Sequence, residues 1–158
     1  MNQSYRTFHS LRFLLIIGLC LSFITSCKKE DNTGNPTPSS QTDLLVAHNW
    51  VTTSVTMPDG QAINSNRLGL ETQVLFKLTM QFRSNGTVRA LDPGQSNSVV
   101  NGGTWTLAAD NQSMDVDVTG FKGNFPIVQL TKSKLILRQN APVDGKKTDI
   151  NLVFDPIL

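Results

Sequence analysis

Large apolar residues occupy every second position along much of the C-terminal part of the chain, and this alternation constrains the fold most. Between Val74 and Phe82 the even positions are all apolar, while the odd positions are polar after Leu75. A period of two predicts a β-strand with one face in a core and the other in water. Asn85-Gly86 follows between two alternating runs and is a strong signal for a hairpin.

The same pattern returns at short intervals as far as the C-terminus. Eight strands are expected, over Trp50–Thr56, Val74–Phe82, Val88–Ala90, Val99–Leu107, Met114–Val118, Phe125–Leu130, Leu135–Leu137 and Ile150–Phe154. Gly102-Gly103 indicates a bulge or a sharp bend within its strand. Pro126 is expected near a strand start or on an edge. Asp43 is expected to cap a short helical turn over Leu44–His48.

About eight sequential antiparallel strands favour an all-β fold. We expect an up-and-down meander that closes into a barrel, because closure removes exposed edges; a β-sandwich is the alternative. The connection from Met57 to Gln73 is long for a hairpin and is expected to be functional or partly structured. Residues 43–158 are expected to form this single domain.

The first 26 residues have the pattern of a secretory signal peptide. Arg6, His9 and Arg12 form a basic start. An apolar run from Phe13 to Ile24 follows and is too short for a transmembrane helix. We therefore expect residues 1–26 to be cleaved from the mature protein.

The segment Ile24-Thr25-Ser26-Cys27 resembles the lipobox of bacterial lipoproteins. This resemblance implies a diacylglycerol on the Cys27 thiol, cleavage before Cys27 and acylation of the new amine. Several acyl chains give stable membrane attachment, since one chain binds only marginally. An ordinary signal peptide followed by an accidental cysteine is the alternative. Cys20 would be removed, so the folded domain would contain no cysteine and no thiol chemistry.

A run of charges, Lys-Lys-Glu-Asp over residues 28–31, follows the cysteine. It resembles the export signal by which one Gram-negative lineage sends lipoproteins to the cell surface. The resemblance implies a lipid-anchored outer-membrane protein that faces the cell exterior; a solvated linker on a periplasm-facing protein is the alternative. Residues 27–42 are polar and are expected to form the lipidated end and a flexible tether.

The charge of the mature chain argues against a nucleic-acid partner. Arg6 and Arg12 are among the 14 basic residues, so 12 basic residues would face 12 acidic ones after cleavage. Nucleic-acid-binding proteins concentrate basic residues on one face, whereas these charges are scattered along the sequence.

Several segments resemble the lipocalin-like domain common in small surface lipoproteins of the same lineage. These segments are HNWVTTSVT, LTMQFRSNGTVRA, NGGTWTL, MDVDV and IVQLTKSKLIL. The resemblance covers about 110 residues and implies an eight-stranded barrel. It implies no particular ligand.

Four residues are candidates for ligand binding. Trp50 and Trp105 are expected either to stack on a ligand or to fill the barrel core. Arg83 and Arg89 flank the predicted hairpin turn and are expected either to form a small anion site or to keep the edge soluble.

No catalytic set is visible in the sequence. His48 is the only histidine after position 26, and no cysteine remains to pair with it. Asp115 and Asp117 share one face of a strand, where a solvated outer face competes with a metal site. We expect no enzymatic activity, no cofactor and no metal.

The expected function is that of a membrane-anchored lipoprotein that binds a small apolar or glycan-derived ligand. An eight-stranded barrel has room inside either for packed side chains or for one small ligand. If the interior is filled, the alternative is a protein-interaction or structural module of the cell envelope. Its contact surfaces would then be the loops Met57–Gln73 and Asp92–Ser98.

Overall fold

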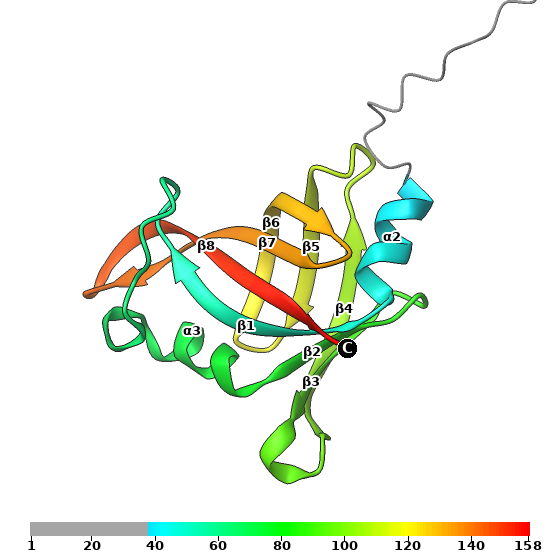
Figure 1. The fold of residues 1–158 in the computed structure, drawn as a ribbon, viewed down its shortest axis with the longest axis horizontal. Helices are drawn as coiled ribbons and strands as arrows, with labels where there is room; N and C mark the ends of the chain where they lie inside the picture. The colour runs from blue at the N-terminus through cyan, green and yellow to red at the C-terminus, as the bar shows by residue number, and fades with distance from the viewer. Residues whose placement is uncertain (1–37) are drawn as a thin grey trace, which may run out of the picture. The chain divides into compact units, whose positions relative to one another are not determined.

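The computed structural model describes residues 38–158, which form a closed barrel of eight antiparallel strands (Figure 1). The strands follow one another around the barrel in sequence order. The predicted all-β meander barrel is therefore confirmed over the β-sandwich. The predicted signal peptide, Cys27 and residues 28–37 of the predicted tether lie outside the described residues.

The strands differ in length, and short helical segments fill two connections. The strands are β1 Asn49–Thr56, β2 Thr79–Phe82, β3 Thr87–Asp92, β4 Ser98–Leu107, β5 Ser113–Val118, β6 Phe121–Thr131, β7 Lys134–Val143 and β8 Lys146–Ile157. The α-helices are α2 Pro38–Val46 and α3 Leu70–Val74, and the 3-10 helices are η1 Ser65–Arg67, η2 Leu75–Lys77 and η3 Pro93–Gln95. None of these helices is long and apolar enough to cross a membrane.

The barrel closes where the first strand pairs with the last. β1 pairs with β8 from Asn49–Ile157 to Thr56–Asn151, with one register shift between Thr52 and Ser54. On its other side β1 pairs with β2 over only three residues. Closure therefore rests mainly on the β1–β8 ladder.

Side chains directed inward from every strand pack into one continuous core. The buried apolar residues of the strands are Trp50, Val55, Met80, Phe82, Val88, Ala90, Trp105, Met114, Val116, Val118, Phe125, Leu135, Leu137, Ala141, Val143, Ile150, Leu152 and Phe154. This core forms because apolar residues that point inward alternate with polar residues that point outward along each strand, as the sequence predicts. The space inside the barrel is occupied by the protein's own side chains.

Both ends of the barrel are covered by segments of the same chain. At one end α2 buries Leu45 in the core. At the other end lies the connection between β1 and β2, residues 57–78, which we call the strap. The strap buries Ile63, Leu68 and Leu75 in the same core, so the expected partial structure of this long connection is confirmed.

The strand expected over Val74–Phe82 is wrong in its first half. Residues 70–77 form α3 and η2, and the strand begins at Thr79. Val74 is 46% exposed, whereas Leu75 is only 4% exposed. The strap folds back across the barrel end in a helical conformation that brings Leu75 into the core, and this tertiary burial overrides the local alternation.

The helix before β1 is longer than expected. In place of a turn over Leu44–His48 capped by Asp43, α2 spans Pro38–Val46 and includes Asp43 within it. Gln41 and Leu45 are both buried and lie four residues apart, on one helix face. The last five residues of the predicted tether are therefore helical.

The bulge expected at Gly102-Gly103 lies slightly earlier in β4. Asn101 pairs with Ala90 and Val99 pairs with Leu91, so the extra residue is Val100. Gly103 instead allows a close approach of strands. A Cβ atom at Gly103 would overlap the main-chain carbonyl oxygen of Asp117 on β5, so only glycine fits there.

Gly103→Ala should lower the free energy of unfolding by about 3 kcal/mol, because the new methyl group forces β4 and β5 apart. Gly102→Ala is the matched control. Its Cβ atom would lie 3.3 Å from the carbonyl oxygen of Val88, a contact that small shifts relieve. Urea denaturation of both variants measures the difference, and equal destabilisation would contradict this account.

Candidate functional site

The two predicted tryptophans belong to the core. Trp50 is fully buried, and its indole N–H donates to the carbonyl oxygen of Leu45 at 2.8 Å. This bond ties the start of β1 to α2. Trp105 is 5% exposed and packs edge-on against Phe82, with ring centroids 5.8 Å apart. Both rings therefore contribute mainly packing and helix attachment.

The two predicted arginines lie on the outside of the β2–β3 hairpin. Arg83 and Arg89 are exposed, and Arg89 stands opposite Gln81 in the ladder. The indole N–H of Trp105 donates to the carbonyl oxygens of Arg83 and Thr87, both at 3.1 Å. Thus Trp105 meets the main chain of Arg83, while the guanidinium group remains at the surface.

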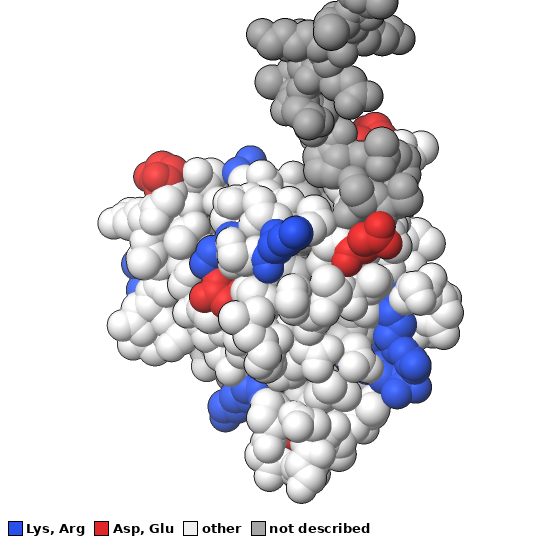
Figure 2. Space-filling model, turned by 45° about the vertical axis from the view of Figure 1, so that its right-hand side comes forward, with Lys and Arg blue, Asp and Glu red and all other residues white. Residues whose placement is uncertain are grey.

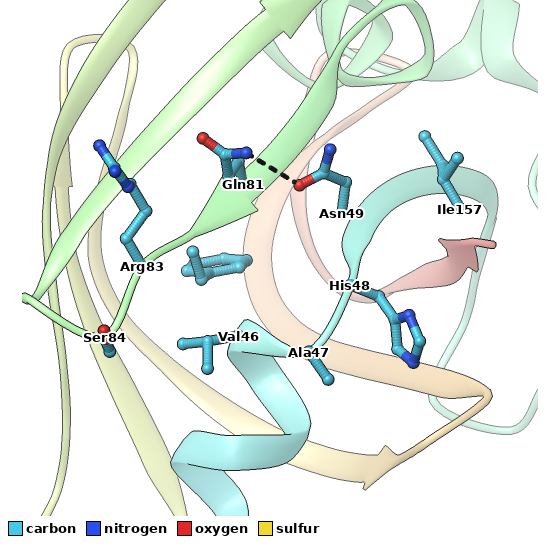
Figure 3. A pocket seen from close by; sticks show the side chains of 9 residues that line it. Val46, Ala47, His48, Asn49, Gln81, Arg83, Ser84 and Ile157 are labelled. Atoms are coloured by element: carbon cyan, nitrogen blue, oxygen red, sulfur yellow. Dashed lines mark hydrogen bonds between the residues drawn. The ribbon is translucent and has the colours of Figure 1, made fainter.

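Arg83 lines a surface hollow of about 440 Å³ beside the C-terminal end of α2. Figure 3 shows Arg83 and Ser84 on one side of this hollow and His48 on the other, so the Arg83 and His48 side chains do not converge. Gln81 donates to Asn49 at 3.2 Å across the hollow. This hydrogen bond joins β2 to β1, so the polar residues that line the hollow have a mainly structural role.

A different site arises where β6 and β7 separate. Their ladder ends at the pair Ile127–Leu137, and before that point β6 pairs only with β5. Past Leu137, β7 forms a ladder only with β8, apart from an isolated bridge between Val143 and Leu68. Figure 1 shows the two strands diverging beyond their shared ladder. We call this gap in the barrel wall the seam, formed by residues 121–126 and 138–142.

The seam holds a cleft of about 460 Å³, within the size range of ligand pockets. Strands β6 and β7 form its walls, α3 closes one side, and β8 adds one residue. The lining residues are Glu71, Thr72, Gly120, Phe121, Lys122, Gly123, Asn124, Phe125, Gln139, Asn140, Ala141, Pro142 and Lys147.

The inner part of the cleft is aromatic. Phe121 and Phe125 stack with centroids 4.4 Å apart and 19° between their planes. Phe125 is buried, while Phe121 is half-buried. Gly123 lies between them in the sequence, with a φ of +145°, and no atom lies within 4 Å of the place where its Cβ atom would stand. The cleft therefore has open space beside an apolar wall.

The outward side chains of β6 are held by neighbouring strands. Asn124 donates to the hydroxyl of Ser113 at 3.0 Å and to the carboxylate of Asp115 at 2.9 Å. Lys122 forms an ion pair with Asp117 at 2.9 Å. These bonds fix the position of this wall of the seam. They also show both aspartates on the solvated outer face of β5.

The wall formed by β7 is held in a similar way. Asn140 donates to the carboxylate of Asp149 on β8 at 2.7 Å. Gln139 points to the inner side, where its amide donates to the hydroxyl of Thr72 on α3 at 3.5 Å. Because this bond is long, the Gln139 amide retains hydrogen-bonding capacity within the cleft.

The strap is fastened to β7 at one end of the seam. Gly69 donates its N–H to the carbonyl oxygen of Pro142 at 3.0 Å, next to an isolated antiparallel bridge at Leu68. Arg67 donates two hydrogen bonds to one carboxylate oxygen of Asp144, at 2.9 and 2.7 Å. The main-chain N–H of Asp144 also donates to the carbonyl oxygen of Arg67 at 2.7 Å.

Charges are mixed around the described domain. On the face drawn in Figure 2, basic and acidic side chains are interspersed among uncharged ones. The residues that the structure describes contain no group of three His, Cys, Asp or Glu placed to hold a metal ion. His48 packs edge-on toward Trp50, with centroids 6.4 Å apart.

Sequence reasoning missed the seam because it depends on which neighbour each strand pairs with. Gly123 and Pro126 were its local signals, since one bends a strand and the other cannot donate to a ladder. Pro126 was expected on an edge or near a strand start. It lies within β6 and not near its start, on the strand edge that faces the seam, at the position where pairing with β7 stops.

Arg67→Gln should raise the pKa of Asp144 toward its ordinary value of 3.8. The hydrogen bond from Arg67 is the main cause that lowers this pKa, and coulombic attraction adds to it. Since the pKa of Asp144 is lowered in the folded protein, the ion pair between Arg67 and Asp144 stabilises the strap above pH 4. This stabilisation is lost as the pH falls through the lowered pKa. NMR titration of the Asp144 carboxyl in both proteins measures the shift.

Arg83→Gln is the control for that titration, because it removes an exposed arginine that makes no contact with the strap. An unchanged Asp144 titration in Arg67→Gln would show that the ion pair does not form in solution. Both partners are more than half exposed, so the loss should weaken the strap locally more than it destabilises the barrel.

Comparisons with known proteins identify similar folds only. No protein-family model and no curated protein matches the chain.

Three solved structures have a similar fold. The crystal structure of a lipocalin-like protein from Bacteroides uniformis matches with 13% identity and a TM-score of 0.48, and the match covers 71% of this chain and 98% of that one. An uncharacterized protein from Bacteroides eggerthii has 14% identity, a TM-score of 0.47 and coverage of 70% and 98%. A DUF4847 family protein from Bacteroides vulgatus has 14% identity, a TM-score of 0.46 and coverage of 72% and 94%. The fold of this chain rests on its own strand pairing.

Proposed function

We propose that the protein is a lipid-anchored interaction module of the outer membrane, displayed on the cell surface and without catalytic activity. One observation carries this proposal: the inward side chains of all eight strands pack as a single core. A barrel filled in this way leaves its outer wall, its ends and the seam for binding. A filled barrel therefore favours binding of a partner protein on the outside over binding of a ligand enclosed by the strands.

Exposed apolar side chains support contact with a partner protein. Leu70 of the strap is 82% exposed, and Val99 and Val100 at the start of β4 are 53% and 47% exposed. These residues lie in or next to the loops Met57–Gln73 and Asp92–Ser98, which the sequence suggested as contact surfaces. Exposed apolar groups are common at interaction sites because burial on binding removes them from water.

The anchor part of the proposal is supported by the sequence before α2. Acylation at Cys27 and the charged run 28–31 account for membrane attachment and surface export together. Eleven peptide steps separate Cys27 from Pro38, a span of at most about 40 Å. The barrel would therefore stay within a few nanometres of the bilayer that holds it.

A small glycan-derived ligand in the seam cleft is the second candidate. The stacked rings of Phe121 and Phe125 offer an apolar surface, and the amide of Gln139 offers both a donor and an acceptor. This combination suits a polar ligand with one apolar face. A purely apolar ligand enclosed by the barrel has no support, since the core is filled.

Cys27→Ala should release the protein from the membrane fraction in soluble or unprocessed form, because no acyl chain would hold it. Replacing residues 28–31 by neutral ones should retain the anchor but reduce digestion by protease added to intact cells. Membrane fractionation, labelling with a radioactive fatty acid and protease accessibility measure these outcomes. The two variants are matched, since one removes the anchor and the other only the export signal.

Fatty-acid label that persists on Cys27→Ala would contradict the anchor. Unchanged protease accessibility after replacement of residues 28–31 would contradict surface display. Each outcome leaves the other part of the proposal open to its own test.

Native mass spectrometry of the anchored protein from its own host should show a bound protein in a fixed ratio. Leu70→Ser should lower the occupancy of that partner several-fold, because the exposed leucine contributes apolar contact area. Thr53→Ala, a change on the outer face of β1, is the control and should leave occupancy unchanged. A bound saccharide mass without a partner protein would favour the second candidate instead.

A further inference from the structure

We propose that the seam binds an extended peptide segment of a partner protein, which adds as a short β-strand between β6 and β7. This inference rests on the proposed interaction function and names the chemistry of the partner. Strand addition uses main-chain hydrogen bonds for affinity and side-chain pockets for specificity. The seam supplies both.

The β6 side of the seam presents unpaired main-chain groups. Ile127 donates its N–H to the carbonyl oxygen of Gln112, which fixes the alternation of hydrogen-bonded pairs between β5 and β6. By that alternation the N–H and C=O groups of Lys122 and Asn124 point away from β5 and toward the seam. β7 forms no ladder pair with these two residues.

The β7 side presents the same kind of edge. A two-residue turn joins Val143 to Lys146, so Val143 and every second residue before it bond to β8. Asn140 belongs to the alternate set of residues, which do not bond to β8, so its main-chain N–H and C=O groups point toward β6. The bond from Gly69 to the carbonyl oxygen of Pro142 confirms this parity, since it uses the same edge.

The chain itself already places an extended segment in one end of the seam. Leu68 and Gly69 of the strap are extended and lie antiparallel to β7, with a bridge between Leu68 and Val143. At Leu70 the chain turns into α3 and leaves the edge beside Asn140 unoccupied. A foreign strand would therefore continue a pairing that the strap has begun.

Two prolines limit the length of the added strand. Pro126 and Pro142 lie at the seam positions whose N–H groups would otherwise face it, so neither donates there. Only three or four residues of a partner can pair between them. This short edge accommodates one segment and discourages the open-ended pairing that leads to aggregation.

The inner side of the seam favours an apolar side chain in the segment. The open space beside Gly123 adjoins the stacked rings of Phe121 and Phe125. Outward positions of the segment would meet Lys122 and Lys147 on the solvent side. The partner segment should therefore alternate apolar and polar residues, with its apolar side chains toward the rings.

The test attaches a peptide to the acylated full-length mature protein in lipid nanodiscs. Lys147→Cys at the rim of the cleft forms a disulfide with acetyl-Cys-Gly-Gly-Thr-Leu-Thr-Val-Thr-amide, which gives a high effective concentration at the seam. Hydrogen exchange followed by mass spectrometry should show the amides that face the seam, those of Lys122, Asn124 and Asn140, exchanging about tenfold more slowly. A copy of the peptide N-methylated throughout should give no protection, because its methyl groups prevent close approach to the strand edges and it has no N–H to donate to their carbonyl oxygens.

Asn140 offers a matched pair of variants. Asn140→Pro removes the main-chain donor on the β7 edge and should abolish most of the protection by the tethered peptide. Asn140→Ala loses the same side-chain bond to Asp149 but keeps the donor, so it should retain protection. Circular dichroism checks that both variants keep the barrel.

Equal protection by the two peptides, or no protection by either, would overturn the strand addition. Protection by free chitotetraose in the absence of peptide would assign the cleft to the glycan-derived ligand and would also overturn it. The anchor is read separately, from the acyl mass on Cys27 and retention in the nanodisc. A missing acyl mass would refute the proposed anchoring without changing the result at the seam.

Discussion

The pairing of β1 with β8 is the constraint on which the rest of the structure depends. It joins the two ends of the meander over Asn49–Thr56 and leaves neither as a free outer edge. A barrel of eight strands has room inside either for packed side chains or for one small ligand, and here the inward side chains form one buried core. The seam cleft lies in the wall of this barrel, between β6 and β7. The indole N–H of Trp50 extends the same closure to α2 through Leu45.

Closure of the wall is incomplete at one place, and its local chemistry explains why. The positive φ of Gly123 bends β6, and Pro126 has no N–H to donate at the position where the ladder with β7 ends. Pro142 weakens the opposite edge in the same manner. The strap covers part of the resulting gap through Gly69 and through the ion pair of Arg67 with Asp144. What remains is a cleft whose walls are strand edges held from outside by cross-strand bonds.

Sequence reasoning predicted the elements that depend on local pattern and missed those that depend on distant contacts. Alternation around Met114–Val118 and Ile150–Phe154 placed β5 and β8, because each strand has one face in the core. The same rule failed at Val74, where the strap needs a helical path to bury Leu75. The seam had no periodic signal, since strand pairing is a property of two segments far apart in sequence.

The position of the seam follows from the direction in which the meander runs. α2 precedes the start of β1, whereas the β5–β6 and β7–β8 turns that bound the seam lie at the end where β1 finishes. Figure 1 places α2 and the tip of the β7–β8 hairpin on opposite sides of the barrel. The strand edges of the seam therefore stand at the end of the barrel away from α2, where an extended segment of another protein reaches them without contacting that helix.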